Sequence, residues 1–302
     1  MFLTGLADEA GSQIDIQIRA IRELSWRYLE SRAIGGKNLA SLSEAEFEQL
    51  WRLLSENGLR INCYAGGIAN FRRHPRNDED FEASKAELQA ALPRMQKLGV
   101  GLVRGMSFLN PPDEKPDNPE LEQIIFRKVG ELVRLCEDAG VVYGHENCMN
   151  YGGISYLHTL KLLERIKSDS FKLIFDTGNP LARFWHPGSN SHALQSPWEF
   201  YSNVREFIVY VHIKDAVPCV TGQIYLDYCF PGEGCADLRP ILRDLKDYGY
   251  DGGFSIEPHM AINYQDRTQS SAEAMAVFKY ENFIQYARKL ETLLQECGWE
   301  LN

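Results

Sequence analysis

Short apolar runs alternate with longer amphipathic segments along the whole chain. The apolar runs have the length and composition of buried strands and lie at 2–7, 28–34, 59–65, 100–108, 141–147, 171–177, 207–215 and 252–258. The segments between them carry apolar residues at helical spacing, at 14–24, 44–57, 80–98, 119–139, 156–167, 197–206, 238–248 and 272–297. Several end at a glycine, as at Gly58, Gly99 and Gly140, which is the usual residue just beyond a helix.

A strict alternation of strand and helix predicts parallel strands joined by right-handed crossovers. Eight such units favour an α/β fold of the closed (β/α)8 TIM-barrel type, with an open doubly wound sheet as the alternative. The 302 residues suit one barrel domain spanning 1–302, and no low-complexity linker divides them. The first residues are expected to form a strand and not a signal peptide, because no basic segment precedes an apolar run.

Two connections are longer than simple turns. They lie at 110–118, which is rich in proline and acids, and at 179–196, which carries Trp185, His186 and Pro187. Both follow predicted strands, on the side where barrel enzymes hold their active sites. Each connection has two possible interpretations, a functional loop or a variable surface loop.

Composition narrows the class of protein. The formal net charge of −10 argues against a protein that coats nucleic acid or an anionic membrane, since both attract basic surfaces. No apolar stretch approaches the ~20 residues of a membrane span. The seven cysteines are scattered without a C-x-x-C pair, which favours free thiols in a reducing cytoplasm. Phosphate-binding glycine loops and a G-x-S-x-G elbow are also lacking in the sequence.

Four polar residues recur at the same place in successive units. Glu146, Asp176, His212 and Glu257 fall at or near the ends of the last four predicted strands. The carboxyl ends of barrel strands meet at one mouth, so these side chains can converge there. Three carboxylates packed together repel one another unless a cation joins them. The set therefore predicts one divalent ion, with Mn²⁺ first and Mg²⁺, Co²⁺ or Zn²⁺ as alternatives. The other interpretation is a set of unrelated acids that cap helices or pair with lysines.

Other residues around the predicted mouth have two interpretations. In the seventh strand Lys214 shares a face with His212, and in the eighth His259 shares a face with Glu257. Each is a candidate to bind substrate, and Lys214 is equally a candidate for an ion pair. Further candidates for lining the mouth or forming ion pairs there are Arg104, Glu233, Glu30 and Arg32.

Five segments in the second half resemble the xylose isomerase-like barrel superfamily, which includes sugar isomerases, ketose 3-epimerases, inosose dehydratases and endonuclease IV. They are GHEN (144–147), FDTGN (175–179), VHIKDA (211–216), PGEG (231–234) and SIEPH (255–259). The resemblance implies that Glu146, Asp176, His212 and Glu257 are metal ligands. It also implies that Glu146 and Glu257 carry protons on opposite faces of the substrate.

The sequence departs from two of these relatives. Endonuclease IV has a histidine where this chain has Asn179, and a D-x-H where this chain has Asp227-Tyr228-Cys229. Ketose 3-epimerases often have histidine at 179, with an arginine near the position of Pro218. We therefore expect no multinuclear nuclease site, and a substrate clamp that differs from the ketohexose type. Asn179 becomes a further candidate substrate-binding residue.

The sequence favours an isomerase or epimerase that removes a proton next to a carbonyl of a sugar or sugar-like polyol. A keto-polyol dehydratase of the inosose type starts with the same proton removal and is the alternative. A non-catalytic sugar-binding barrel and an endonuclease IV-like nuclease are weaker alternatives. The expected partner is a small sugar or polyol, with no nucleic acid or membrane, and self-association into a homo-oligomer is compatible with the sequence.

Overall fold

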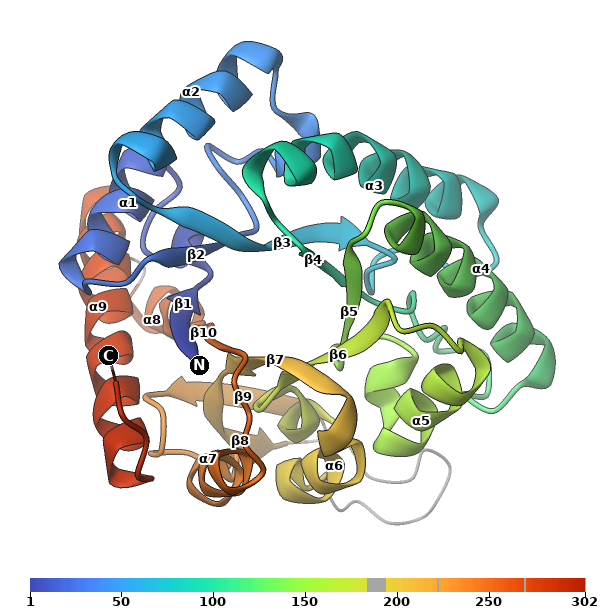
Figure 1. Cartoon of the computed structure of the whole chain (residues 1–302). Helices are drawn as coiled ribbons and strands as arrows, with labels where there is room; N and C mark the ends of the chain where they lie inside the picture. Colours follow the sequence, from blue (N-terminus) through green and yellow to red (C-terminus); the bar gives the residue numbers. More distant parts are fainter. Residues whose placement is uncertain (184–193, 222, 269, 302) are drawn as a thin grey trace.

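The computed structural model describes residues 1–183, 194–221, 223–268 and 270–301, and its main sheet is a parallel barrel (Figure 1). The barrel strands are β1 (Phe2–Gly5), β2 (Tyr28–Ser31), β3 (Arg60–Ile68), β4 (Leu102–Gly105), β5 (Val142–Glu146), β6 (Phe171–Asp176), β7 (Ile208–Ile213) and β10 (Gly253–Ile256). They pair in the order β1-β10-β7-β6-β5-β4-β3-β2, and a parallel bridge between Leu6 and Glu30 joins the two ends. The predicted (β/α)8 barrel is therefore confirmed.

Helices surround the barrel (Figure 1). In the described part of the chain they are α1 (Ile14–Glu23), α2 (Glu44–Glu56), α3 (Asp78–Leu98), α4 (Pro119–Asp138), α5 (Tyr156–Arg165), α6 (Pro197–Val204), α7 (Leu238–Asp247), α8 (Met260–Thr268) and α9 (Ala272–Glu296). Most begin at a residue whose side chain accepts a bond from the first turn. At α2, Glu46 N–H donates to Ser43 Oγ while Ser43 N–H donates to the Glu46 carboxylate, a capping box. No helix in the described residues is long and apolar enough to cross a membrane.

Side-chain alternation divides the core into two layers, as the strand pattern predicts. Tyr210 lies inside the barrel in a small cluster with Cys63 and Ile174. Phe254 and Ile256 of β10 point the other way and join the large cluster between the strands and the helices. Residues of β7 and β10 that share the inner face therefore point into the barrel. Those at the carboxyl ends of the strands lie at its mouth.

A two-stranded antiparallel hairpin was not predicted. Its strands are β8 (Asp215–Val220) and β9 (Ile224–Cys229), which pair only with each other. The run predicted as one strand at 207–215 ends at Ile213, and the chain leaves the barrel there. The helix α8 was also not predicted. Of the long connection 179–196, residues 184–193, including Trp185, His186 and Pro187, lie outside the described residues.

Candidate metal centre

The carboxyl ends of β5, β6, β7 and β10 each carry one side chain that can bind a metal. Potential ligand atoms of Glu146, Asp176, His212 and Glu257 lie within 4.8 Å of one another, and all four residues are buried. The barrel register explains the convergence, because Asp176 pairs with His212 across β6 and β7, and His212 pairs with Ser255 across β7 and β10. The structure thus brings together the four residues that the sequence singles out.

Each of these four side chains has one buried polar atom that makes no hydrogen bond to any described residue. These atoms are Oε2 of Glu146, Oδ2 of Asp176, Nδ1 of His212 and Oε2 of Glu257. Buried polar atoms in proteins almost always have a hydrogen-bond partner, and near these three carboxylate oxygens the other described residues place only the charged groups of Lys214 and Arg104. Three carboxylate oxygens and one imidazole nitrogen form a donor set that fits a single divalent cation.

The backbone after β6 fixes the orientation of Asp176. Its Oδ1 accepts hydrogen bonds from the N–H groups of Gly178 at 2.9 Å and Asn179 at 2.7 Å. The Asn147 side chain donates to the backbone oxygen of Asp176 at 3.0 Å and accepts from its N–H at 2.7 Å. With Oδ1 held in this way, Oδ2 is the oxygen left for the centre.

Lys214 and Asn179 link the carboxylates. Lys214 Nζ lies 2.9 Å from Asp176 Oδ2 and 2.8 Å from Glu257 Oε2, and it donates to Asn179 Oδ1 at 3.2 Å. Asn179 in turn donates from Nδ2 to Glu146 Oε1 at 3.3 Å. Asn179 therefore connects the lysine to Glu146.

Burial and charge move the pKa values of the carboxyl groups in opposite directions. Burial alone would raise the pKa of Glu146, but the charges of Arg104 and His212 outweigh it and lower the pKa to about 2. Arg104 Nη1 lies 3.4 Å from Glu146 Oε2. At Asp176 burial dominates, Lys214 offsets it only in part, and the charges of Glu257 and Glu146 add to it, so that the pKa is raised to about 6. A bound dication would relieve this crowding of negative charge.

A second group of potential ligands shares Glu257 with the first. It consists of Glu9, Glu257 and His259. Arg32 already places its guanidinium there, with Nη2 3.3 Å from Glu9 and Nη1 3.4 Å from Glu257. His259, whose φ is +55°, has its ring Nδ1 2.7 Å from the Glu9 carboxylate and donates its backbone N–H to the same group at 2.8 Å. The Glu9 carboxylate already pairs with Arg32 and His259, so of the two groups only the first brings together four potential ligand residues.

A cavity of about 560 Å³ opens above the centre, within the roughly 300–1,000 Å³ usual for small-molecule sites. Glu146 and Glu257 line it, whereas Asp176 and His212 are not among its lining residues. The other predicted site residues that line it are Arg104, Asn179, Lys214 and His259. The two glutamates therefore can reach a substrate while the other two ligand residues lie behind them.

Glu233 is the predicted substrate-binding residue that the structure leaves outside the cavity lining. It forms an ion pair with Lys289 of α9 instead. The PGEG segment is held in another way, because Asp215 accepts hydrogen bonds from the N–H groups of Gly232 at 2.9 Å and Gly234 at 3.0 Å. These bonds turn the backbone toward Asp215 and leave the Glu233 side chain on the outside.

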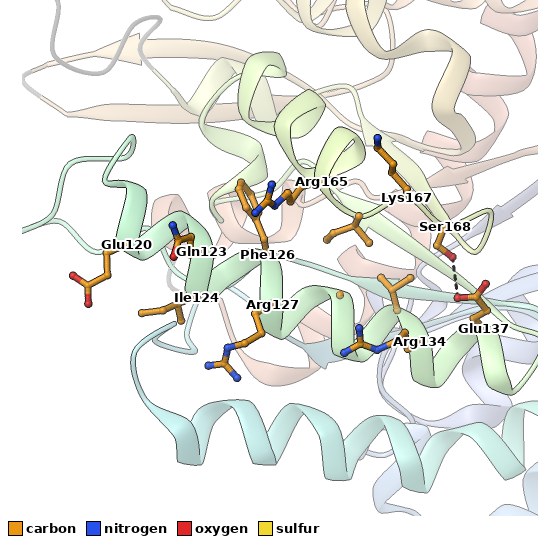
Figure 2. Close-up of a pocket in the computed structure, with 13 residues that line it drawn as sticks. Glu120, Gln123, Ile124, Phe126, Arg127, Arg134, Glu137, Arg165, Lys167 and Ser168 are labelled. Atoms are coloured by element: carbon orange, nitrogen blue, oxygen red, sulfur yellow. Dashed lines mark hydrogen bonds between the residues drawn. The ribbon is translucent and has the colours of Figure 1, made fainter.

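A larger and more open groove, of about 840 Å³, lies on the outer face between α4 and α5 (Figure 2). Arg127, Arg134 and Arg165 line it, and Ser168 donates to Glu137 across its far end at 3.3 Å. None of its lining residues belongs to a group of potential metal ligands. The site for chemistry is therefore the smaller cavity at the barrel mouth.

Two side chains that shape the cavity were missed from the sequence. Leu226 and Tyr228 belong to the β8–β9 hairpin, and both line the cavity. The Tyr228 ring meets the His259 ring edge to face, with centroids 5.2 Å apart. The alternation of residues at 224–229 was the available signal, but it is short and lies next to a stronger strand. The hairpin thus supplies an apolar and aromatic wall.

His145, next to Glu146, gives a prediction about stability. It is buried beside Phe171, with Nε2 3.0 Å from Ser107 Oγ, and burial lowers its pKa to about 4. At pH values between about 6.5, the ordinary pKa of histidine, and about 4, this side chain binds a proton in the unfolded chain but stays neutral in the folded chain. We expect this residue to cost roughly 2 kcal/mol of stability as the pH falls from 7.5 to 5.

The variant His145→Gln removes this titration. Urea unfolding in the presence of EDTA, at pH 7.5 and pH 5, measures the free energy of unfolding of both proteins. The wild type should lose roughly 2 kcal/mol more than the variant over this interval. Equal losses would show that His145 does not remain neutral in the folded protein.

The profile of the xylose isomerase-like TIM barrel family matches residues 18–281. An inosose dehydratase from Clostridium beijerinckii is 26% identical over 152 residues, which cover 46% of this chain and 48% of that protein. The chain thus spans about half the length of the curated relatives that it matches.

Solved structures resemble nearly the whole chain. The IolI protein, with a bound zinc atom, has a TM-score of 0.74 at 17% identity and covers 100% of both chains. A D-tagatose 3-epimerase-like protein has a TM-score of 0.69 at 20% identity, covering 98% and 99%. A protein of this barrel type from Mycobacterium smegmatis, in complex with magnesium, has a TM-score of 0.68 at 17% identity, covering 97% of each. At these identities the likeness concerns the fold.

Proposed function

This chain belongs to the xylose isomerase-like TIM barrel family, and we propose that it is a divalent-metal-dependent isomerase or epimerase of a sugar or sugar-like polyol. The observation that carries the proposal is the convergence of four buried potential ligand atoms, one from each of Glu146, Asp176, His212 and Glu257, at the base of a cavity. Such a set would hold one ion, which we propose to be Mn²⁺, with Mg²⁺, Co²⁺ or Zn²⁺ as substitutes.

The two glutamates are the proposed acid–base pair. A bound ion would supply Lewis-acid polarisation of a carbonyl and its neighbouring hydroxyl, which acidifies the C–H bond between them. Glu146 and Glu257 both line the cavity and come from different strands, β5 and the end of β10, so they approach a substrate from two sides. One carboxylate removes the proton from carbon, and the other returns a proton to the opposite face.

Side chains around the pair would bind and orient the substrate. Lys214, Asn179 and Arg104 line the cavity and already contact the carboxylates, so they can donate to substrate oxygens without large movements. The hairpin wall of Leu226 and Tyr228 covers the same space and restricts entry of water. We propose a small sugar or polyol for this cavity, and His259 as a further contact.

A keto-polyol dehydratase is the second candidate, and one observation favours it. Glu9 binds both the ring Nδ1 and the backbone N–H of His259, which turns Nε2 toward Glu257 at 3.4 Å beside the cavity. With its Nδ1 proton held by Glu9, the ring in its protonated form can donate from Nε2 to a departing hydroxyl. The curated relatives named inosose dehydratase agree with this candidate over about half their length.

Incubation in D₂O separates these activities. The metal-loaded protein is mixed with a panel of ketoses and inososes, and products are followed by mass spectrometry and proton NMR. Carbon-bound deuterium without loss of water would identify an isomerase or epimerase, and loss of one water would identify a dehydratase. No exchange with any substrate, despite a full complement of metal, would favour a non-catalytic sugar-binding barrel.

The remaining proposals concern partners and location. The net charge of −10 supports a protein without nucleic-acid or membrane partners, and Asn179 in place of histidine supports a mononuclear centre over a nuclease site. All seven cysteines are free, which supports a reducing compartment such as the cytoplasm.

A further inference from the structure

A buried carboxylate on the opposite side of the barrel binds the histidine of the candidate centre. Glu30 of β2 is fully buried, and both its oxygens lie 3.1 Å from His212 Nε2. It also accepts hydrogen bonds from Tyr210 OH at 3.0 Å and from Ser255 Oγ at 2.6 Å. A carboxylate is costly to bury unless donors surround it. Tyr210, Ser255 and His212 can each donate a hydrogen bond, so Glu30 is an acceptor here.

This contact decides which ring nitrogen of His212 is free. Because an ionised Glu30 can only accept, the proton of the neutral imidazole must be on Nε2. The lone pair is then on Nδ1, which has no hydrogen-bond partner among the described residues. Nδ1 lies 3.5 Å from Glu146 Oε1 and 3.5 Å from Glu257 Oε2, so it faces the other ligand residues.

We propose that Glu30 is a positioning residue that fixes the tautomer and the ring orientation of His212, so that Nδ1 is the atom offered to the metal ion. The inference rests on the proposed function, since it requires an ion at the centre. Carboxylates that orient metal-bound histidines commonly change metal affinity by 10–100-fold when they are removed. Glu30 lies outside the five segments that carry the family resemblance, which fall between residues 144 and 259.

A line of hydrogen bonds holds Glu30 in place. Tyr210 OH, which donates to Glu30, accepts from Asn62 Nδ2 at 2.8 Å. Asn62 Oδ1 accepts from Thr4 Oγ1 at 2.8 Å. The line joins β7, β3 and β1 across the barrel interior. The carboxylate therefore cannot turn away from His212 without breaking several buried bonds, which makes it a rigid support.

The test is the affinity of the variant Glu30→Gln for Mn²⁺ and Zn²⁺, measured by isothermal titration calorimetry. Glutamine keeps the size of the side chain but removes its charge, and only one of its two terminal atoms can accept from His212. We expect Kd to rise about 10–100-fold. Glu87→Gln is the matched control, because Glu87 is also a largely buried acid with several donors, including Tyr64 OH at 2.9 Å, and lies outside the candidate centre. Its Kd should stay within about twofold of the wild type, while a Glu30→Gln value within the same range would overturn the proposal.

A spectroscopic measurement on the wild type does not depend on the variant folding. Long-range ¹H–¹⁵N NMR of protein labelled with ¹⁵N-histidine and loaded with Zn²⁺ reports the state of each ring nitrogen, with His212→Asn to assign the signals. We expect a protonated Nε2 and a metal-bound Nδ1 for His212. A metal-bound Nε2 would overturn the inference and leave the proposed function standing. Failure of the wild type to bind any divalent ion would instead overturn both.

Discussion

Replacing Asp176 with asparagine is expected to remove the metal ion and to lower kcat/KM by at least about a thousandfold. Loss of a single preorganised transition-state donor already costs roughly 10²–10³-fold, and this change removes the ion itself. The substitution tests the role of Asp176 in binding the ion separately from its role in holding the backbone. Asp176 Oδ1 accepts the two backbone hydrogen bonds, from Gly178 and Asn179. An asparagine oxygen can keep both bonds.

The change therefore falls on Oδ2, the oxygen that faces the other potential ligand atoms. An amide group there would turn its hydrogens toward the ion and toward Lys214, whose Nζ lies 2.9 Å from Oδ2. Metal content by inductively coupled plasma mass spectrometry should fall from about one ion per chain to near zero. Circular dichroism should remain that of the folded barrel.

Asp215→Asn is the matched control for this experiment. Asp215 is also buried and also accepts backbone hydrogen bonds, from Ala216, Gly232, Gly234 and Ala236, but it does not belong to the candidate centre. We expect it to lower thermal stability and to keep the ion. If Asp176→Asn binds metal as tightly as the wild type, the quartet is not the metal centre.

The barrel and the approximate position of the centre could be predicted from the sequence because both depend on local pattern. Short strands whose side chains alternate between two faces are each followed by a segment with apolar residues at helical spacing. This order leaves few arrangements other than a closed parallel barrel. The end of each strand is then the mouth of the barrel. Glu146, Asp176 and Glu257 needed only this rule to be placed near one another.

What the sequence could not predict depends on contacts between distant segments. The hairpin β8–β9 is short and antiparallel, and its first strand follows β7 after a single residue, so the two appeared as one strand. Glu30 lies between Leu29 and Ser31 in β2, and its role appears only when β7 is placed across the barrel from it. Glu233 shows the reverse case, because a family motif places it near the mouth while Lys289 holds it outside.

The variants Glu146→Gln and Glu257→Gln are expected to lose proton transfer on different faces of the substrate. In an epimerase each glutamate serves one of the two epimers as the base, so each variant should lose exchange of the reacting hydrogen with solvent from a different epimer. The loss expected for removing a positioned base is about 10²–10⁴-fold. Exchange is followed in D₂O from each epimer separately, before any net conversion.

Both residues are also candidate ligands, so the comparison must be made with metal in excess and with bound metal measured. Their surroundings differ, which helps to separate the two roles. Glu257 contacts Lys214 and Arg32, at 2.8 and 3.4 Å, whereas Glu146 contacts Arg104 and Asn179. A dehydratase needs only one base to remove the proton, so in that case one variant alone should abolish exchange. Equal loss from both epimers in both metal-loaded variants would contradict the division of the two faces between Glu146 and Glu257.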